Sequence, residues 1–128
     1  MKKVFCMLLS ALLALGSVSA LADDVITIGG LAPLSGAVAV YGTAVQQAAD
    51  LYVEQVNANG GILGKQVQIE WLDTKGDVTE AINAYNRLYS EGVSALLGPV
   101  ITATALAVAD YAGQDGIPMM TATATNYD

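Results

Sequence analysis

The 128-residue chain contains no histidine, one cysteine, three prolines and few charged residues, which make up 13% of the sequence. Without histidine the commonest general base is missing, and one cysteine cannot form a disulfide framework or a Cys/His zinc site. An enzyme built from this sequence would depend on carboxylates or hydroxyl groups alone. We therefore expect no catalytic residues, no metal site and no cofactor.

Hydrophobic residues make up 54% of the chain and are concentrated at its start. Lys2 and Lys3 precede a run over residues 4–15 that is apolar except for Ser10, and residues 20–22 have the small-x-small pattern of a cleavage site. The run is shorter than the roughly 20 residues of a spanning helix. The pattern predicts a signal peptide over residues 1–22, cleaved after Ala22 or after Ala20, with an uncleaved anchor as the alternative.

Cleavage would also change the charge balance. The sequence contains five basic and twelve acidic residues, and removal of residues 1–22 leaves only Lys65, Lys75 and Arg87 as cations. The predicted mature chain, residues 23–128, therefore has a net charge of about −9. Such a charge argues against nucleic acid and anionic membrane surfaces as partners. Cys6 leaves with the signal peptide and does not follow a lipobox, so a soluble exported protein is expected.

The mature sequence alternates between predicted strands and helices. We expect strands at residues 25–28, 67–71, 93–97 and 117–120, and helices at 43–58, 77–91 and from Thr102 or Thr104 to about Tyr111. Asp77 has the capping-box spacing to Glu80. The order βαβαβαβ predicts an α/β fold with a doubly wound parallel sheet, whose ligands bind at the carboxyl ends of the strands. The polar face of the second strand predicts that it lies near the sheet edge.

Two motifs of enzyme chemistry are weak or missing. Gly29, Gly30 and Gly36 do not form the dinucleotide-binding pattern, and no phosphate-binding P-loop occurs. Asp73 and Asp77 could form a carboxylate pair, but a helix cap next to a turn residue is the simpler interpretation. Residues 33–36 fit a structural turn and a ligand-facing loop equally well.

Two loops at the predicted ligand edge are more informative. A helix that begins in residues 98–104 directs unpaired N–H groups and a threonine hydroxyl at the strand ends, which suits a carboxylate. The alternative is that Thr102 only caps its own helix. The second loop, residues 121–126, is small and rich in hydroxyl groups, and it could bind a compact polar ligand or have no ligand at all.

Several segments together resemble the leucine/isoleucine/valine-binding protein family, the periplasmic substrate-binding proteins of branched-chain amino acid ABC transporters. The similar segments are Ile28-Gly29, Leu34-Ser35-Gly36, Tyr41-Gly42, Val56-Asn57-Ala58-Asn59-Gly60-Gly61-Ile62-Leu63-Gly64, the strand end at Asp73 and Leu97-Gly98-Pro99. They occur in the family order and cover essentially all of the mature chain. The N-A-x-G-G-I-x-G segment is the most specific of them.

The resemblance implies a type 1 periplasmic binding protein, in which two α/β lobes close over an amino acid without catalysis. It places Thr102 as a hydroxyl toward the ligand, Val100 on the pocket wall, Thr123 and Thr125 on a second binding loop, and Tyr41 over the ligand side chain. It also implies delivery to a membrane ABC permease and a monomer at full length. Residues 101–104 replace a serine run of the family, so the resemblance assigns the ligand class and not the particular amino acid.

Family members are about three times as long as the mature chain. We therefore expect residues 23–128 to be the N-terminal part of the first lobe, and to bind amino acids weakly or not at all without the rest of the cleft. An amino-acid or amide sensor on the same fold is the alternative function. An exported Rossmann-like enzyme is the least favoured alternative, because its motifs are missing.

Overall fold

The structure is a computed structural model that describes residues 25–125, so the predicted signal peptide, residues 1–22, lies outside the described residues. Within the described residues, four strands alternate with three helices. They are β1 (Ile26–Ala32), α2 (Ala39–Ala58), β2 (Val67–Asp73), α3 (Val78–Ser90), β3 (Ala95–Leu97), α4 (Thr102–Asp115) and β4 (Met119–Met120). None of the helices within the described range is long and apolar enough to cross a membrane.

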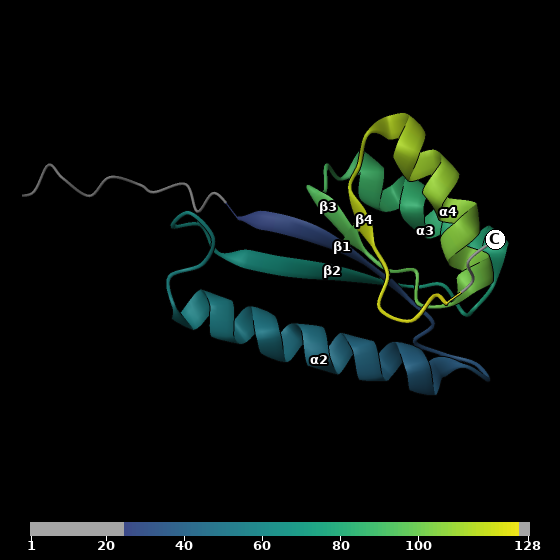
Figure 1. Ribbon diagram of the computed structural model, residues 1–128, viewed down its shortest axis with the longest axis horizontal. Helices are drawn as coiled ribbons and strands as arrows, with labels where there is room; N and C mark the ends of the chain where they lie inside the picture. Colours follow the sequence, from purple (N-terminus) through teal and green to yellow (C-terminus); the bar gives the residue numbers. More distant parts are fainter. Residues whose placement is uncertain (1–24, 126–128) are drawn as a thin grey trace, which may run out of the picture.

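The strands form one parallel sheet in the order β2-β1-β3-β4. Helix α2 lies on one face of this sheet, and α3 and α4 lie together on the other face (Figure 1). This arrangement confirms the predicted doubly wound α/β sheet, and β2 lies at the edge as predicted. The chain leaves β1 toward β2 and leaves β3 in the opposite direction toward β4. The carboxyl ends of β1 and β3 therefore flank the switch point where such folds bind ligands.

The hydrophobic core lies between the sheet and the pair α3 and α4. Its members are buried to more than nine tenths and come from β1, β3, both helices and the connection between α3 and β3: Leu31, Ala81, Ala84, Tyr85, Leu88, Val93, Leu96, Val108 and Ala112. Gly29 in β1 makes room for this packing, because a Cβ atom there would lie 2.8 Å from Leu88 Cδ1. The two crossover helices are thus fixed against the central strands, and their N-termini point to the carboxyl edge of the sheet.

The opposite face is only partly covered. Helix α2 packs against β1 and β2, and an open apolar groove of about 320 Å³ lies between this helix and the strands β3 and β4. Tyr52 of α2 lines this groove and is 67% exposed, although the apolar spacing of the helix predicts that it faces inward. Since a single helix cannot cover four strands, this face of the sheet is broader than α2, and Tyr52 lies beside the part that the helix leaves open.

Several predicted boundaries are wrong at glycines and alanines. Strand β1 continues through Gly29 and Gly30 to Ala32, because each of these residues pairs with β2 in register. Helix α2 begins at Ala39 rather than at residue 43. Helix α4 continues to Asp115 through Gly113 and ends only at Gly116, which adopts the left-handed conformation. The apolar spacing of α3 predicts that Tyr89 faces inward, but this residue is 45% exposed.

Asn57, the first residue of the N-A-x-G-G-I-x-G segment, has a structural role. Its side-chain Nδ2 donates to Val67 O at 2.7 Å, and its Oδ1 accepts from Val67 N at 2.8 Å, so one amide joins the end of α2 to the start of β2. Asn59, two residues later, makes only an exposed bond from Nδ2 to Gln55 O in its own helix. Asn57 therefore fixes the connection between these elements.

We expect Asn57→Ala to lower the free energy of unfolding by about 2 kcal/mol, because it leaves both backbone groups of the buried Val67 without their partner. Urea unfolding measures this change, with Asn59→Ala as the matched control. The control should cost less than about 1 kcal/mol, since its bond is exposed. Equal losses for the two variants would contradict this role of Asn57.

Candidate ligand-binding site

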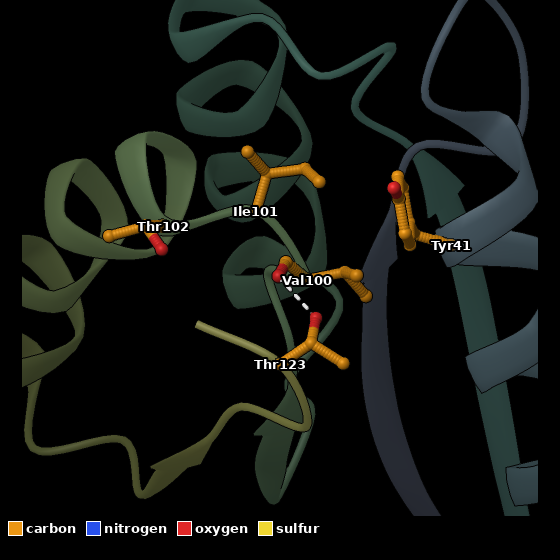
Figure 2. Close-up of a pocket in the computed structure, with 5 residues that line it drawn as sticks. All are labelled: Tyr41, Val100, Ile101, Thr102 and Thr123. Atoms are coloured by element: carbon orange, nitrogen blue, oxygen red, sulfur yellow. Dashed lines mark hydrogen bonds between the residues drawn. The ribbon is translucent and has the colours of Figure 1, made fainter. Parts of the chain in front are cut away.

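A pocket of about 240 Å³ lies at the switch point, on the carboxyl edge of the sheet. Its lining residues come from three separate segments: Tyr41, Val100, Ile101, Thr102 and Thr123. Figure 2 shows Tyr41 on one side of this pocket, the segment from Val100 to Thr102 opposite it, and Thr123 bonded to Val100. The pocket thus brings together four of the five site residues predicted from the sequence, and it adds Ile101.

The segment between β3 and α4 forms the polar wall of this pocket. Val100 is 1% exposed, and the next residue, Ile101, occupies the N-cap position in an extended conformation. No side chain caps this helix, so the interpretation of Thr102 as the cap is wrong. Thr102 is instead the first helical residue, and its N–H is among those that have no acceptor within the helix. This N-terminus therefore offers donors and a partial positive charge to the pocket.

The threonine loop after β4 is bonded directly onto this segment. Thr121 Oγ1 donates to Pro99 O at 2.7 Å, and Thr123 Oγ1 donates to Val100 O at 2.7 Å. In addition, the backbone N–H of Thr125 donates to Thr102 Oγ1 at 3.3 Å. Two strand ends that are adjacent in the sheet are joined in this way into one polar surface.

These bonds leave one pocket hydroxyl group able to donate a hydrogen bond to a ligand and the other able only to accept one. A hydroxyl carries one proton and two acceptor lone pairs. Thr123 uses its proton on Val100 O, so its oxygen can only accept further bonds. Thr102 accepts from Thr125 N, so its proton stays available for a bond to an anion. The pocket therefore has a donor end at Thr102 and an acceptor end at Thr123.

Tyr41 supplies the apolar wall opposite Val100 and Ile101. It lies in the first turn of α2, and its side chain is 58% exposed at the rim of the pocket. The next residue, Gly42, is buried against the preceding loop, since a Cβ atom there would lie 2.0 Å from Pro33 O. Only glycine allows this close approach of the two backbones, and the contact fixes the position of the helical turn that carries Tyr41.

The two carboxylates that could have formed a catalytic pair have separate structural roles. Asp77 caps α3, as predicted, because its Oδ1 accepts from Glu80 N at 2.9 Å. Asp73 accepts bonds from Ser35 Oγ, Leu34 N and Lys75 N. Burial opposes ionisation of Asp73, but the bond from Ser35 Oγ together with those from backbone amides outweighs burial and lowers its pKa below the ordinary value. Asp73 is thus bound as an anion to the loop after β1, and Asp77 is bound to the first turn of α3.

The remaining predicted residue, Thr125, does not line the pocket. It is exposed and contributes its backbone N–H to Thr102. Ile101 was not singled out from the sequence, although its position between Val100 and Thr102 in the same loop is the signal that could have found it. Within residues 25–125, no group of three or more Asp, Glu, Cys or His side chains is placed to hold a metal ion.

The doubly wound sheet and the pocket at its switch point can be compared with those of known families. Residues 25–128 match the family described as "Periplasmic binding protein". The chain belongs to this family. The match extends over every element of the sheet and over all the loops of the candidate site.

Individual relatives are proteins that bind branched-chain amino acids. The Leu/Ile/Val-binding protein BraC3 of Rhizobium johnstonii is 40% identical over 108 residues, which are 84% of this chain and 29% of the relative. The solved structure of the branched-chain amino acid transporter substrate binding protein LivJ from Streptococcus pneumoniae, in complex with isoleucine, is 36% identical with a TM-score of 0.77, and the match covers 81% of this chain and 30% of that one.

A leucine binding protein, LivK, from Thermotoga maritima is 31% identical with a TM-score of 0.71, over 79% of this chain and 28% of its own. The type 1 periplasmic binding protein fold inferred from the sequence is therefore confirmed. The chain spans about three tenths of the length of the curated relatives it matches.

Proposed function

We propose that this protein binds a branched-chain amino acid, leucine, isoleucine or valine, at the carboxyl edge of its sheet. The observation that carries the proposal is the uncapped N-terminus of α4, where the Thr102 hydroxyl can donate in a pocket that the apolar side chains of Tyr41, Val100 and Ile101 also line. An α-amino acid with an aliphatic side chain has the matching groups. The names of the relatives support the same ligand class.

In this proposal each end of the amino acid meets the complementary end of the pocket. The ligand carboxylate accepts bonds from the Thr102 hydroxyl and from the first amides of α4, where the helix dipole favours an anion. The ammonium group donates to the oxygen of Thr123, whose own proton is engaged by Val100 O. The aliphatic side chain packs against Tyr41 and Ile101. Binding involves no chemical step, so the protein is not an enzyme.

We also propose that residues 23–128 form the first part of the N-terminal lobe of a two-lobe protein. The length of the relatives supports this proposal, since this chain spans only 29% of the first of them. The second lobe would then close over the ligand and exclude water. Residues 1–22 would direct the chain to the periplasm, where it works as a monomer and delivers the amino acid to a membrane ABC permease. The transport proteins among the relatives favour this role over a sensor.

Calorimetric titration of the full-length protein tests this proposal. We expect leucine, isoleucine or valine to bind, and Thr102→Val to weaken binding by about tenfold or more, because a hydrogen bond to a charged group contributes about 1.5–3 kcal/mol. The valine is isosteric but has no proton to donate to the carboxylate. The matched control is Thr79→Val, since Thr79 is exposed and does not line the pocket.

Two analogues of leucine test the donor end and the acceptor end of the pocket separately. We expect 4-methylpentanoate, which lacks the ammonium group, to keep its dependence on Thr102, and 3-methylbutylamine, which lacks the carboxylate, to lose it. Affinity for leucine that is the same in wild type and Thr102→Val would contradict the assigned orientation. Failure of the wild-type protein to bind any of the three amino acids would contradict the proposed ligand class.

A further inference from the structure

The carboxylate of Asp73 connects two loops at the carboxyl edge of the sheet. It belongs to the last residue of β2, yet it accepts bonds from the loop after β1: Ser35 Oγ lies 2.5 Å from Oδ2, and Leu34 N lies 2.8 Å from Oδ1. The same Oδ1 accepts from Lys75 N at 2.8 Å in its own loop. A single anion therefore fixes the positions of both loops relative to each other.

The loop that Asp73 holds leads directly into the helix that carries Tyr41. Ala39 N donates to Gly36 O at 3.3 Å, and Tyr41 N donates to Val38 O at 3.1 Å. No side chain caps α2 at its start. The first turn of this helix therefore depends on the loop before it for its position.

Packing reinforces this dependence and leaves the loop little freedom. A Cβ atom on Gly76 would lie 2.7 Å from Val38 Cγ2, so the loops after β1 and β2 are in contact beyond the hydrogen bonds of Asp73. The Pro33 carbonyl lies against Gly42, next to Tyr41. A shift of residues 34–36 would therefore move the first turn of α2 and the tyrosine ring with it.

We propose that Asp73 is a positioning residue for ligand binding: as an anion it fixes the loop at residues 33–38 and thereby holds Tyr41 at the rim of the pocket. Asp73 itself does not line the pocket. The inference rests on the proposed function, because it concerns the affinity of the same site.

A double-mutant cycle on the full-length protein tests the coupling between Asp73 and Tyr41. Leucine affinity is measured by calorimetry for wild type, Asp73→Asn, Tyr41→Ala and the double variant. We expect each single change to weaken binding by about tenfold, and the double variant to bind no more than about twofold more weakly than Tyr41→Ala, because the two residues act through one path. A purely structural role of Asp73 would instead multiply the two losses.

Two further variants complete the test. Glu80→Gln removes the ion pair with Lys75 at 3.0 Å in the same region but leaves the bonds of Asp73 in place, and it should not change leucine affinity. Ser35→Ala removes one of the bonds and should weaken binding by about threefold in the wild-type background and not in Tyr41→Ala. This second cycle decides the question if Asp73→Asn does not fold.

The outcomes separate this inference from the proposed function. If the wild-type protein binds no branched-chain amino acid, the proposed function is wrong. If the wild-type protein binds leucine and Asp73→Asn binds it with the same affinity, the positioning role is overturned. If Asp73→Asn does not fold, the same affinity in Ser35→Ala and wild type overturns it. Losses that multiply in the double variant overturn it as well.

Discussion

Gly98→Ala is expected to lower the free energy of unfolding by at least about 3 kcal/mol, which combines strain of the left-handed backbone with a steric clash. Gly98 has φ +101°, and a Cβ atom there would lie 2.1 Å from Leu31 O and 3.0 Å from Leu31 C. The residue cannot move away, because its N–H donates to Met120 O at 2.7 Å and it connects β3 to the segment of the candidate site. Urea unfolding followed by circular dichroism measures the loss.

Gly113→Ala is the matched control for this change. Gly113 lies inside α4 with an ordinary helical φ, and an added Cβ atom would meet nothing within 4 Å. Alanine there should raise the free energy of unfolding by up to about 1 kcal/mol, because it is the better helix former. If Gly98→Ala proved as stable as Gly113→Ala, the close approach of β1 to the site loop would be wrong.

If the proposed two-lobe organisation is right, residues 23–128 produced alone are expected to bind leucine, isoleucine and valine at least about a hundredfold more weakly than the full-length protein, because half a cleft leaves one side of the ligand in water. The pocket within residues 25–125 has one wall of polar groups and a tyrosine that is 58% exposed. Calorimetric titration of both proteins with the three amino acids measures the ratio.

The apolar groove beside α2 provides a check on the same sample. Ile28, Leu97 and Met120 line this groove and would face solvent in the isolated segment, so we expect it to bind a hydrophobic dye that the full-length protein does not bind. Circular dichroism is the control for folding, and it should give a helix content comparable to that of the structure. A folded segment with full-length affinity for leucine would show that the second lobe is not needed for the site.

The order of elements could be predicted from the sequence because hydrophobic spacing decides it locally. The capping of α3 by Asp77 is confirmed for the same reason, since Asp77 and Glu80 are close in sequence. The boundaries at Gly29 and Gly30 are wrong because distant residues decide them. Gly29 stays in the strand, where its missing side chain makes room for Leu88 and Leu96. The boundary at Gly113 is wrong for another reason, because a glycine inside a helix weakens it without ending it.

The candidate site was predicted as a set of loops rather than as an arrangement of atoms. The sequence indicates that residues 98–104 and 121–126 meet at one edge, and the structure places Thr102 and Thr123 on one pocket. Which hydroxyl donates and which accepts could not be predicted, because each is decided by a partner at least 23 residues away in the sequence. The bonds of Asp73 to residues 34 and 35 escape sequence analysis for the same reason.

A crystal structure of the full-length protein with leucine tests the central claim most directly, through the distances from the leucine carboxylate to Thr102 Oγ1 and to the first amides of α4. We expect a carboxylate oxygen within about 3 Å of both donors, with the ammonium group toward Thr123 Oγ1. Leucine bound elsewhere, or with its ammonium group at the start of α4, would contradict the proposed site.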